Sequence, residues 1–141
     1  AEFAVGDRVF GFDDSRFGGH GGYAASRGRG GVAKIPDGVS FETAGIAAEG
    51  AHYALGYLEA AEVTAGHSVL VYGATGVIGS AAVQLAVQRG AHVTAVGDAD
   101  KLDMAGALGA HRVVDRLTED FTKDDQRYHL HYSGNMKQFK L

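Results

Sequence analysis

The residues best suited to chemistry form the glycine-rich turn Gly73-Ala74-Thr75-Gly76-Val77-Ile78-Gly79. The turn follows the apolar run Val69–Tyr72 and precedes apolar residues at helical spacing, so it joins a buried strand to a helix. The free N–H groups and the dipole at the start of such a helix favour a bound phosphate. The pattern therefore predicts a site for a dinucleotide's diphosphate; the alternative is a tight strand-to-helix turn without a ligand. The predicted cofactor-binding residues in this turn are Gly73, Thr75, Gly76, Val77 and Ile78.

Each glycine in this turn has a separate expected task. Gly73 supplies the turn itself, and Gly76 lets the phosphate approach the backbone. Gly79 lets the helix lie close to the strand before it.

An acidic residue stands where the adenosine ribose would be bound. Asp98 follows the second apolar run, Val93–Val96, and lies nineteen positions after Gly79. It could instead act as the N-cap of the short helix that follows, a position for which Asp100 competes. A carboxylate beside the ribose would repel a 2′-phosphate and favours NAD, although Lys101 could pair with that phosphate. The expected cofactor is NAD or NADP, with a slight preference for NAD.

Other polar residues are weaker candidates for an active or metal site. Each of them could equally be an ordinary residue of a loop, a helix surface, the core or a strand surface. The pair His129 and His131 would share one face of a strand, but no cysteine or carboxylate completes a metal site. No metal, and in particular no zinc, is expected, and the catalytic residues stay unknown. The remaining weaker candidates are His20 with Asp13 and Asp14, and the group Glu49, His52 and Tyr53.

The elements around the turn alternate between strand and helix. After the strand at 69–72 and its helix come a strand at 93–96, a short helix closed by Gly109, and a strand at 111–115. This order predicts an α/β fold with right-handed parallel crossovers, a parallel βαβαβ unit that is part of a Rossmann fold. The segment 127–132 could be a fourth strand.

The chain before this unit has a different pattern of expected secondary structure. Short strands are expected at 7–12, 23–26 and 32–35, as in the edge of an antiparallel β unit. The segment 43–61 is rich in Ala, Leu and Glu and predicts helix, in two pieces because Gly45, Gly50 and Gly56 interrupt it.

Composition excludes several classes of protein. The chain is 45% hydrophobic and 21% charged, with a net charge of −4 and no basic cluster, so nucleic acid and membranes are not expected partners. No apolar run reaches the roughly 18 residues of a membrane span, and no leader is visible at Ala1–Phe3. The expected location is the cytoplasm.

The sequence from Phe3 to Asp115 resembles the medium-chain dehydrogenase/reductase superfamily. Within it, the sequence is similar to the zinc-independent branch of quinone-oxidoreductase-like, NAD(P)-dependent alcohol dehydrogenases. The resemblance is carried by pieces in the family's order. They are Val5-Gly6-Asp7-Arg8-Val9-Phe10-Gly11, Phe17-Gly18-Gly19-His20, Val32-Ala33-Lys34-Ile35-Pro36, Glu49-Gly50-Ala51-His52-Tyr53-Ala54-Leu55, the run from Val69 to Leu85, and Leu108-Gly109-Ala110 before Val113-Val114-Asp115.

The resemblance implies three regions: residues 1–40 from the C-terminal part of a GroES-like substrate domain, a helical connection at 41–62, and the N-terminal half of a Rossmann domain at 63–141. It also implies hydride transfer between a nicotinamide and a small-molecule quinone, enone or carbonyl substrate, with 49–53 near the nicotinamide. Full-length relatives are expected to be homo-oligomers. The chain departs from the family at 129–135, so we expect an incomplete piece with an atypical tail.

Two alternatives accompany this hypothesis. A short-chain reductase could use the same glycine turn, but none of the six tyrosines has the lysine four residues on that this group requires. A truncated, catalytically inactive nucleotide-binding module would keep the turn and lack turnover.

Overall fold

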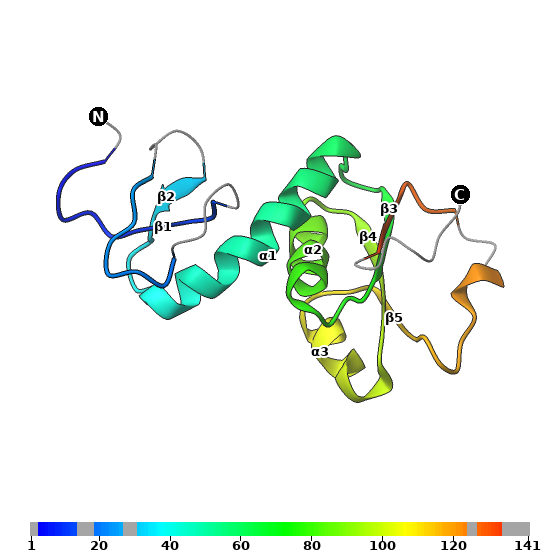
Figure 1. The fold of residues 1–141 in the computed structure, drawn as a ribbon. Helices are drawn as coiled ribbons and strands as arrows, with labels where there is room; N and C mark the ends of the chain where they lie inside the picture. Colours follow the sequence, from blue (N-terminus) through cyan, green and yellow to red (C-terminus); the bar gives the residue numbers. More distant parts are fainter. Residues whose placement is uncertain (1–2, 14–18, 27–30, 124–126, 134–141) are drawn as a thin grey trace. The chain divides into compact units, whose positions relative to one another are not determined.

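The computed structural model describes residues 3–13, 19–26, 31–123 and 127–133 (Figure 1). The chain divides into two compact units, Ala1–Glu49 and Gly50–Leu141, and the boundary falls inside the first helix. Within the described ranges, no helix is long and apolar enough to cross a membrane.

The first unit contains an antiparallel pair of short strands. Strand β1 (Val9–Gly11) pairs with β2 (Val32–Lys34), and Val9 lies opposite Lys34. This pair confirms the antiparallel unit expected before the Rossmann part. The strand predicted at 23–26 is wrong: these residues are not in a strand, and the Tyr23 side chain is fully exposed. Residue types that suit a strand are not sufficient without a neighbouring strand to pair with.

One continuous helix, α1 (Phe41–Ala60), follows the strand pair. Ser40 caps its start, since the hydroxyl accepts a hydrogen bond from the Thr43 amide at 3.1 Å. The prediction of two helical pieces is wrong, because single glycines weaken a helix by only about 1 kcal/mol each. Gly50 has a packing reason: a Cβ there would lie 2.8 Å from the carbonyl oxygen of Val77.

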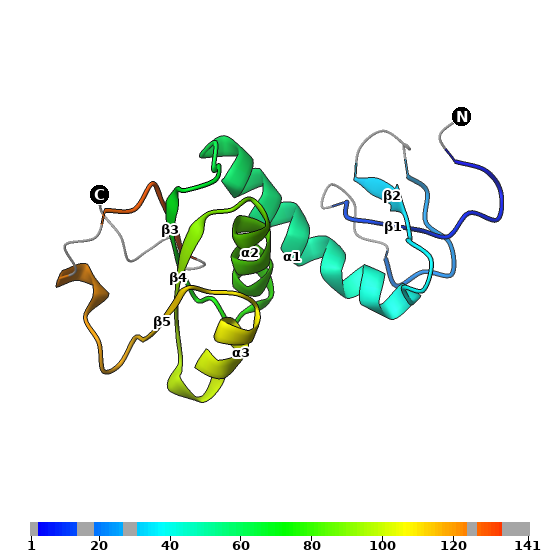
Figure 2. The ribbon, with the colours of Figure 1, turned by 180° about the vertical axis from the view of Figure 1, so that it is seen from behind.

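The second unit is a four-stranded sheet in which every strand pairs in parallel. The strand order is β5-β4-β3-β6, which confirms the predicted partial Rossmann fold. The helices α2 and α3 lie together on one side of this sheet in both views (Figures 1 and 2). The elements are β3 (Ser68–Tyr72), α2 (Val77–Gln88), β4 (His92–Gly97), the 3₁₀ turn η1 (Ala99–Lys101), α3 (Leu102–Ala107), β5 (Arg112–Asp115), η2 (Phe121–Lys123) and β6 (Leu130–Ser133).

Strand β6 confirms the fourth strand suggested by the sequence. It pairs with β3 on the side opposite β4, with Val69 opposite Leu130. The strand order therefore reverses at β3, and in open α/β sheets such a reversal marks the place where ligands bind. The tail predicted to be atypical after Ser133 lies outside the described residues.

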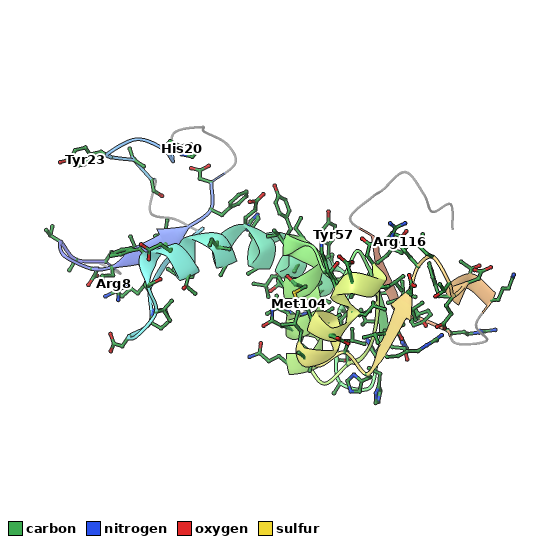
Figure 3. All side chains as sticks on the ribbon, turned by 90° about the horizontal axis from the view of Figure 1, so that it is seen from below. Arg8, His20, Tyr23, Tyr57, Met104 and Arg116 are labelled. Atoms are coloured by element: carbon green, nitrogen blue, oxygen red, sulfur yellow. The ribbon has the colours of Figure 1, made fainter. Side chains whose placement is uncertain are left out.

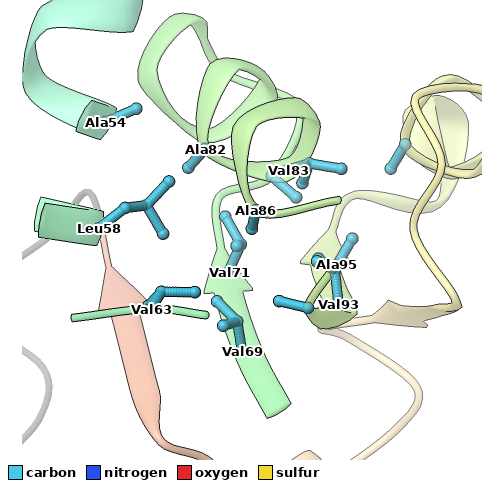
Figure 4. Packing of buried hydrophobic residues seen from close by; sticks show 13 residues of the cluster. Ala54, Leu58, Val63, Val69, Val71, Ala82, Val83, Ala86, Val93 and Ala95 are labelled. Carbon is cyan, nitrogen blue, oxygen red and sulfur yellow. The ribbon is translucent and has the colours of Figure 1, made fainter. Parts of the chain in front are cut away.

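The main core lies between the sheet and the helices. Valines of β3 and β4 meet small residues of α2, so that the helix backbone can approach the strands closely (Figure 4). Leu58 of α1 joins this cluster and is 1% exposed. On the opposite face of the sheet, a smaller cluster packs against Phe121 and Tyr128; its buried members are Leu70, Val96 and Val114.

Candidate nucleotide-binding site

The glycine turn is fastened to the carboxyl edge of the sheet. Gly73 has a φ of +77°, a conformation that glycine adopts without strain. Its amide and that of Ala74 both donate to the carbonyl of Val96 in β4, at 2.9 and 3.1 Å. The Gly76 amide then donates to the Gly73 carbonyl at 3.1 Å, which closes the turn. The chain therefore enters α2 directly at the carboxyl end of β3.

The first turn of α2 presents free backbone donors. Gly76 is the N-cap residue, and no side chain caps the helix. The first backbone bond that closes the helix runs from the Ser80 amide to the Gly76 carbonyl at 2.8 Å. Among the residues that the structure describes, no acceptor is found for the amides of Val77, Ile78 and Gly79. Three donors and the positive end of the helix dipole thus stand where a phosphate would bind.

The reasons for glycine differ between the two later positions of the turn, Gly76 and Gly79. A Cβ at Gly79 would lie 2.1 Å from the carbonyl oxygen of Gly73 and 2.9 Å from the Cα of Ala74, so the helix or the turn would have to shift to make room for it. This confirms that Gly79 permits the close approach of helix and turn. A Cβ at Gly76 would find only one neighbour, the Gly73 oxygen at an ordinary 3.5 Å. The protein itself therefore does not require glycine at 76, and the open space beside it suits an approaching phosphate.

Thr75 links the turn to the end of β4. Its side chain is half-buried, and its Cγ2 would lie 3.2 Å from a Cβ at Gly97. Because β3 and β4 are parallel with Tyr72 opposite Val96, the turn and the residue after Gly97 leave the same edge of the sheet. The structure thus brings Asp98 to the edge that carries the glycine turn.

Asp98 makes an ion pair that the sequence analysis did not foresee. It is the N-cap residue of η1, as the alternative held, but its side chain makes no capping hydrogen bond. The carboxylate instead accepts a hydrogen bond from Nε of Arg116, with 2.5 Å between Nε and Oδ1. Both side chains remain accessible, with exposed fractions of 45% for Asp98 and 41% for Arg116. Arg116 is labelled in Figure 3.

The pair perturbs the arginine electrostatically. The hydrogen bond and charge of Asp98, with a smaller contribution from Tyr72, raise the pKa of the Arg116 guanidinium above its ordinary value. Arg116 could have been noticed in the sequence, because it follows the third strand directly and parallel strands end at a common edge. Which partner it takes depends on the strand register.

The structure describes only part of the weaker candidates. His20 lies exposed in a turn, and its sequence neighbour Asp14 is outside the described residues. The rings of His52 and Tyr53 meet edge to face at 5.4 Å on α1, where His52 is exposed and Tyr53 half-buried. Glu49 is exposed.

His129 has a structural partner at the amino end of β3, the end of the strand opposite the glycine turn. Its ring stacks on His67 at 4.2 Å, and its Nδ1 accepts a hydrogen bond from the Ser68 amide at 3.1 Å. The side chain of His131 is outside the described part. No group of three metal-binding side chains is found within the residues that the structure describes.

Comparison with known proteins shows which proteins this chain is similar to. No family model matches the chain. A polyketide synthase of Streptomyces halstedii, GfsB, is 40% identical over 111 residues, which is 77% of this chain and 2% of that protein. The quinone oxidoreductase of Coxiella burnetii has a similar structure, with a TM-score of 0.61 and 30% identity over 65% of this chain and 29% of that one.

A second solved structure was determined with a cofactor. The quinone oxidoreductase of Thermus thermophilus, described with its NADPH complex, superposes with a TM-score of 0.57 and 35% identity. The match covers 60% of this chain and 29% of that chain. The chain therefore spans less than a third of the length of these relatives. It is similar to members of the medium-chain dehydrogenase/reductase superfamily and contains part of a Rossmann fold.

Proposed function

We propose that this chain is the cofactor-binding part of an oxidoreductase that binds a nicotinamide dinucleotide at the turn Gly73–Gly79. The observation that carries the proposal is the set of three backbone amides at the start of α2, for which the described residues offer no acceptor. Gly76 leaves open space beside them, and no side chain caps the helix. These features fit a diphosphate, and the packing of the turn gives no other reason for glycine at 76.

The protein's contribution to the reaction is binding and orientation. The amides of Val77 and Ile78 would hold the diphosphate, and Gly73 and Thr75 would position the turn. Asp98 would lie at the ribose, at the neighbouring strand end. When bound, a nicotinamide dinucleotide supplies a hydride to the substrate or accepts one from it, and no protein nucleophile is needed.

The substrate class, the zinc independence and the oligomeric state that we propose are inferred from the resemblance to the family. We infer a small-molecule quinone, enone or carbonyl substrate, zinc-independent chemistry, and homo-oligomers for the full-length relatives. Related quinone oxidoreductases support the substrate class, and the lack of cysteine in this chain supports the absence of zinc. The cofactor is NAD or NADP, and a carboxylate beside the ribose, that of Asp98, is the reason for a slight preference for NAD. Nucleic acid and membranes are not expected partners of a chain with net charge −4.

Equilibrium titration of the chain with NADH and NADPH tests the proposal. The chain has no tryptophan, so the fluorescence of the reduced nicotinamide is easily followed. The informative variant is Gly76→Val, whose side chain would occupy the space beside the free amides. Its matched control is Gly106→Val on α3, where a Cβ also meets no close neighbour. We expect Gly76→Val to weaken binding at least about tenfold, which corresponds to about 1.4 kcal/mol, and the control to bind like the wild type.

The outcomes separate the two hypotheses. Binding together with reduction of a quinone by NADH or NADPH supports the oxidoreductase. Binding without turnover supports the nucleotide-binding module. If the folded wild-type chain binds neither nucleotide, or if Gly76→Val binds as well as the control, the site is not at this turn.

A further inference from the structure

A histidine stands at the start of each parallel strand, at the end of the sheet opposite the glycine turn. In the lateral order of the strands from β5 to β6, these residues are His111, His92, His67 and His129. His129 stacks on His67 with 4.2 Å between the ring centroids, and His111 meets His92 edge to face at 4.9 Å. Between the two ring pairs, the His92 amide donates to the His67 carbonyl at 2.8 Å. The four histidines therefore form a row along the amino edge of the sheet.

The two outer histidines of the row make the same contact with the strand beside them. The His129 amide donates to the Ser68 carbonyl at 2.8 Å, and Nδ1 of the His129 ring accepts a hydrogen bond from the Ser68 amide at 3.1 Å. The His111 amide donates to the Val93 carbonyl at 2.9 Å, and Nδ1 of its ring accepts a hydrogen bond from the Val93 amide at 3.2 Å. Each outer histidine thus binds both backbone groups of one residue on the inner strand, an arrangement that we call a histidine clamp.

Each clamp extends the ladder of an edge strand by one position toward the amino end. The first residue of β6, Leu130, lies opposite Val69, and the first residue of β5, Arg112, lies opposite Thr94. At the position before each of these pairs, the ring takes the place of the backbone acceptor that a longer edge strand would supply. Val93 is fully buried, so loss of the ring would leave its amide without an acceptor in the interior of the sheet.

A ring nitrogen that accepts a hydrogen bond carries no proton. In a neutral imidazole one nitrogen is a donor and the other an acceptor, so the proton of His111 and of His129 is on Nε2. A second proton can be added only at Nδ1, where it would face the backbone N–H and replace the hydrogen bond by a contact between two donors. For the same reason, neither ring has a free lone pair for a metal ion. The clamps therefore exist only while both rings are neutral.

The surroundings of the clamps do not stabilise a charged ring. Within the part of the chain that the structure describes, no carboxylate forms an ion pair with a ring of this row. Each outer ring faces another imidazole, so protonation of both rings of a pair would place like charges 4.2 or 4.9 Å apart. The charged groups on the adjoining segments are paired with one another or exposed: Arg112 with Glu119, Arg89 with Glu59, and the exposed Glu62 and Arg127.

We propose that the two histidine clamps form a pH-sensitive switch, which attaches the edge strands β5 and β6 while His111 and His129 are neutral and releases the amino ends of these strands when the rings take up protons. Histidine is the side chain whose charge ordinarily changes between about pH 5 and 8. The contribution of the clamps to stability is therefore present above this range and is lost as the pH falls through it. The switch is separate from the nucleotide site, because the clamps lie at the amino end of the strands and the glycine turn at the carboxyl end.

NMR spectroscopy of the whole chain tests the clamps directly. Long-range ¹H–¹⁵N spectra at about pH 7.5 show which ring nitrogen carries the proton, and we expect Nε2 for both His111 and His129. Amide hydrogen exchange, corrected for its intrinsic pH dependence, is then compared at about pH 7.5 and about pH 5. We expect the protection of the Ser68 and Val93 amides to fall about fivefold or more on acidification, the value of one lost hydrogen bond. The amides that bond between β3 and β4 should keep their protection.

Asparagine separates the acceptor from the charge, because its carbonyl oxygen can take the place of Nδ1 and does not titrate. The informative variant is the double substitution His111→Asn and His129→Asn, and the matched control is His20→Asn, at an exposed histidine in a turn of the first unit. The equilibrium constant of folding is measured by urea unfolding at about pH 7.5 and about pH 5. On acidification we expect it to fall about tenfold further in the wild type than in the double variant, and His20→Asn should behave like the wild type.

Four results would overturn the inference. The first is a proton on Nδ1 of either outer ring at about pH 7.5, and the second is a lack of protection of the Ser68 and Val93 amides at that pH. The third is an equal loss of protection throughout the sheet on acidification, and the fourth is a double variant as sensitive to pH as the wild type. All four leave the proposed function intact, since they do not concern the binding of NADH or NADPH.

Discussion

A methyl group added at Gly79 tests how closely α2 approaches the turn before it. In Gly79→Ala the new Cβ would lie 2.1 Å from the Gly73 oxygen, 2.8 Å from its carbonyl carbon and 2.9 Å from the Cα of Ala74. All three neighbours are backbone atoms, so no side chain can rotate away and the helix or the turn must move. Overpacking of this kind costs about 3 kcal/mol at the upper end of its usual range, and alanine returns about 1 kcal/mol of helix propensity. We therefore expect a net loss of about 2 kcal/mol.

The assay is urea unfolding followed by far-UV circular dichroism, with the free energy of unfolding obtained by linear extrapolation. The matched control is Gly56→Ala on α1, where a Cβ would meet nothing within 4 Å. The control should gain about 0.5–1 kcal/mol, because the same helix propensity acts there without a clash. If Gly79→Ala is as stable as Gly56→Ala, the helix does not lie against the turn and the reasoning about the glycine spacing is refuted.

Three further variants test the core, a helix end and an exposed carboxylate. Leu58→Ala, at a residue 1% exposed, should lower the free energy of unfolding by about 3 kcal/mol in the same assay, and a loss below about 1 kcal/mol would show that α1 does not pack on the core. Gly109→Ala combines a φ of +98° with a Cβ 3.1 Å from Cγ1 of Val87, so it should cost at least about 1 kcal/mol; a gain in stability, as at an unstrained helix position, would contradict the left-handed conformation. Hydrogen bonds from Thr122, followed by other local contacts, lower the pKa of Asp120, so its contribution to stability is present above about pH 4 and is lost as the pH falls through its folded pKa. The stability difference between wild type and Asp120→Asn should therefore shrink between pH 5 and about pH 2, and a constant difference would refute this assignment.

Much of the second unit could be predicted because its signals are local. The strand at 69–72 and its glycine turn require only a buried apolar run and a break that opens a helix. Gly90 ends α2 with a φ of +79° and the bond from the Ala91 amide to the Ala86 carbonyl, which is a local signal of the same kind. The prediction of a strand at 23–26 was wrong, because residue types that suit a strand do not by themselves form one.

The role of Gly50 illustrates what local sequence could not provide. Within the sequence, three glycines in twenty residues suggested a broken helix, yet α1 is continuous. The reason for Gly50 lies 27 residues further along the chain, at the carbonyl oxygen of Val77, which would lie 2.8 Å from a Cβ. A residue whose purpose is a distant close contact cannot be distinguished from a helix breaker by inspection of its neighbours.

Hydrophobic periodicity, turn residues and helix starts each depend on a few consecutive residues. The sequence by itself was therefore sufficient to locate the turn Gly73–Gly79 and to predict the parallel strands beside it. The pairing of distant segments depends on which surfaces meet after folding. The tertiary structure alone decided that β6 lies beside β3 and that Asp98 meets Arg116. Both contacts arise from the lateral order and register of strands, which are set by the burial of a shared core and leave no trace in the spacing of residues along the chain.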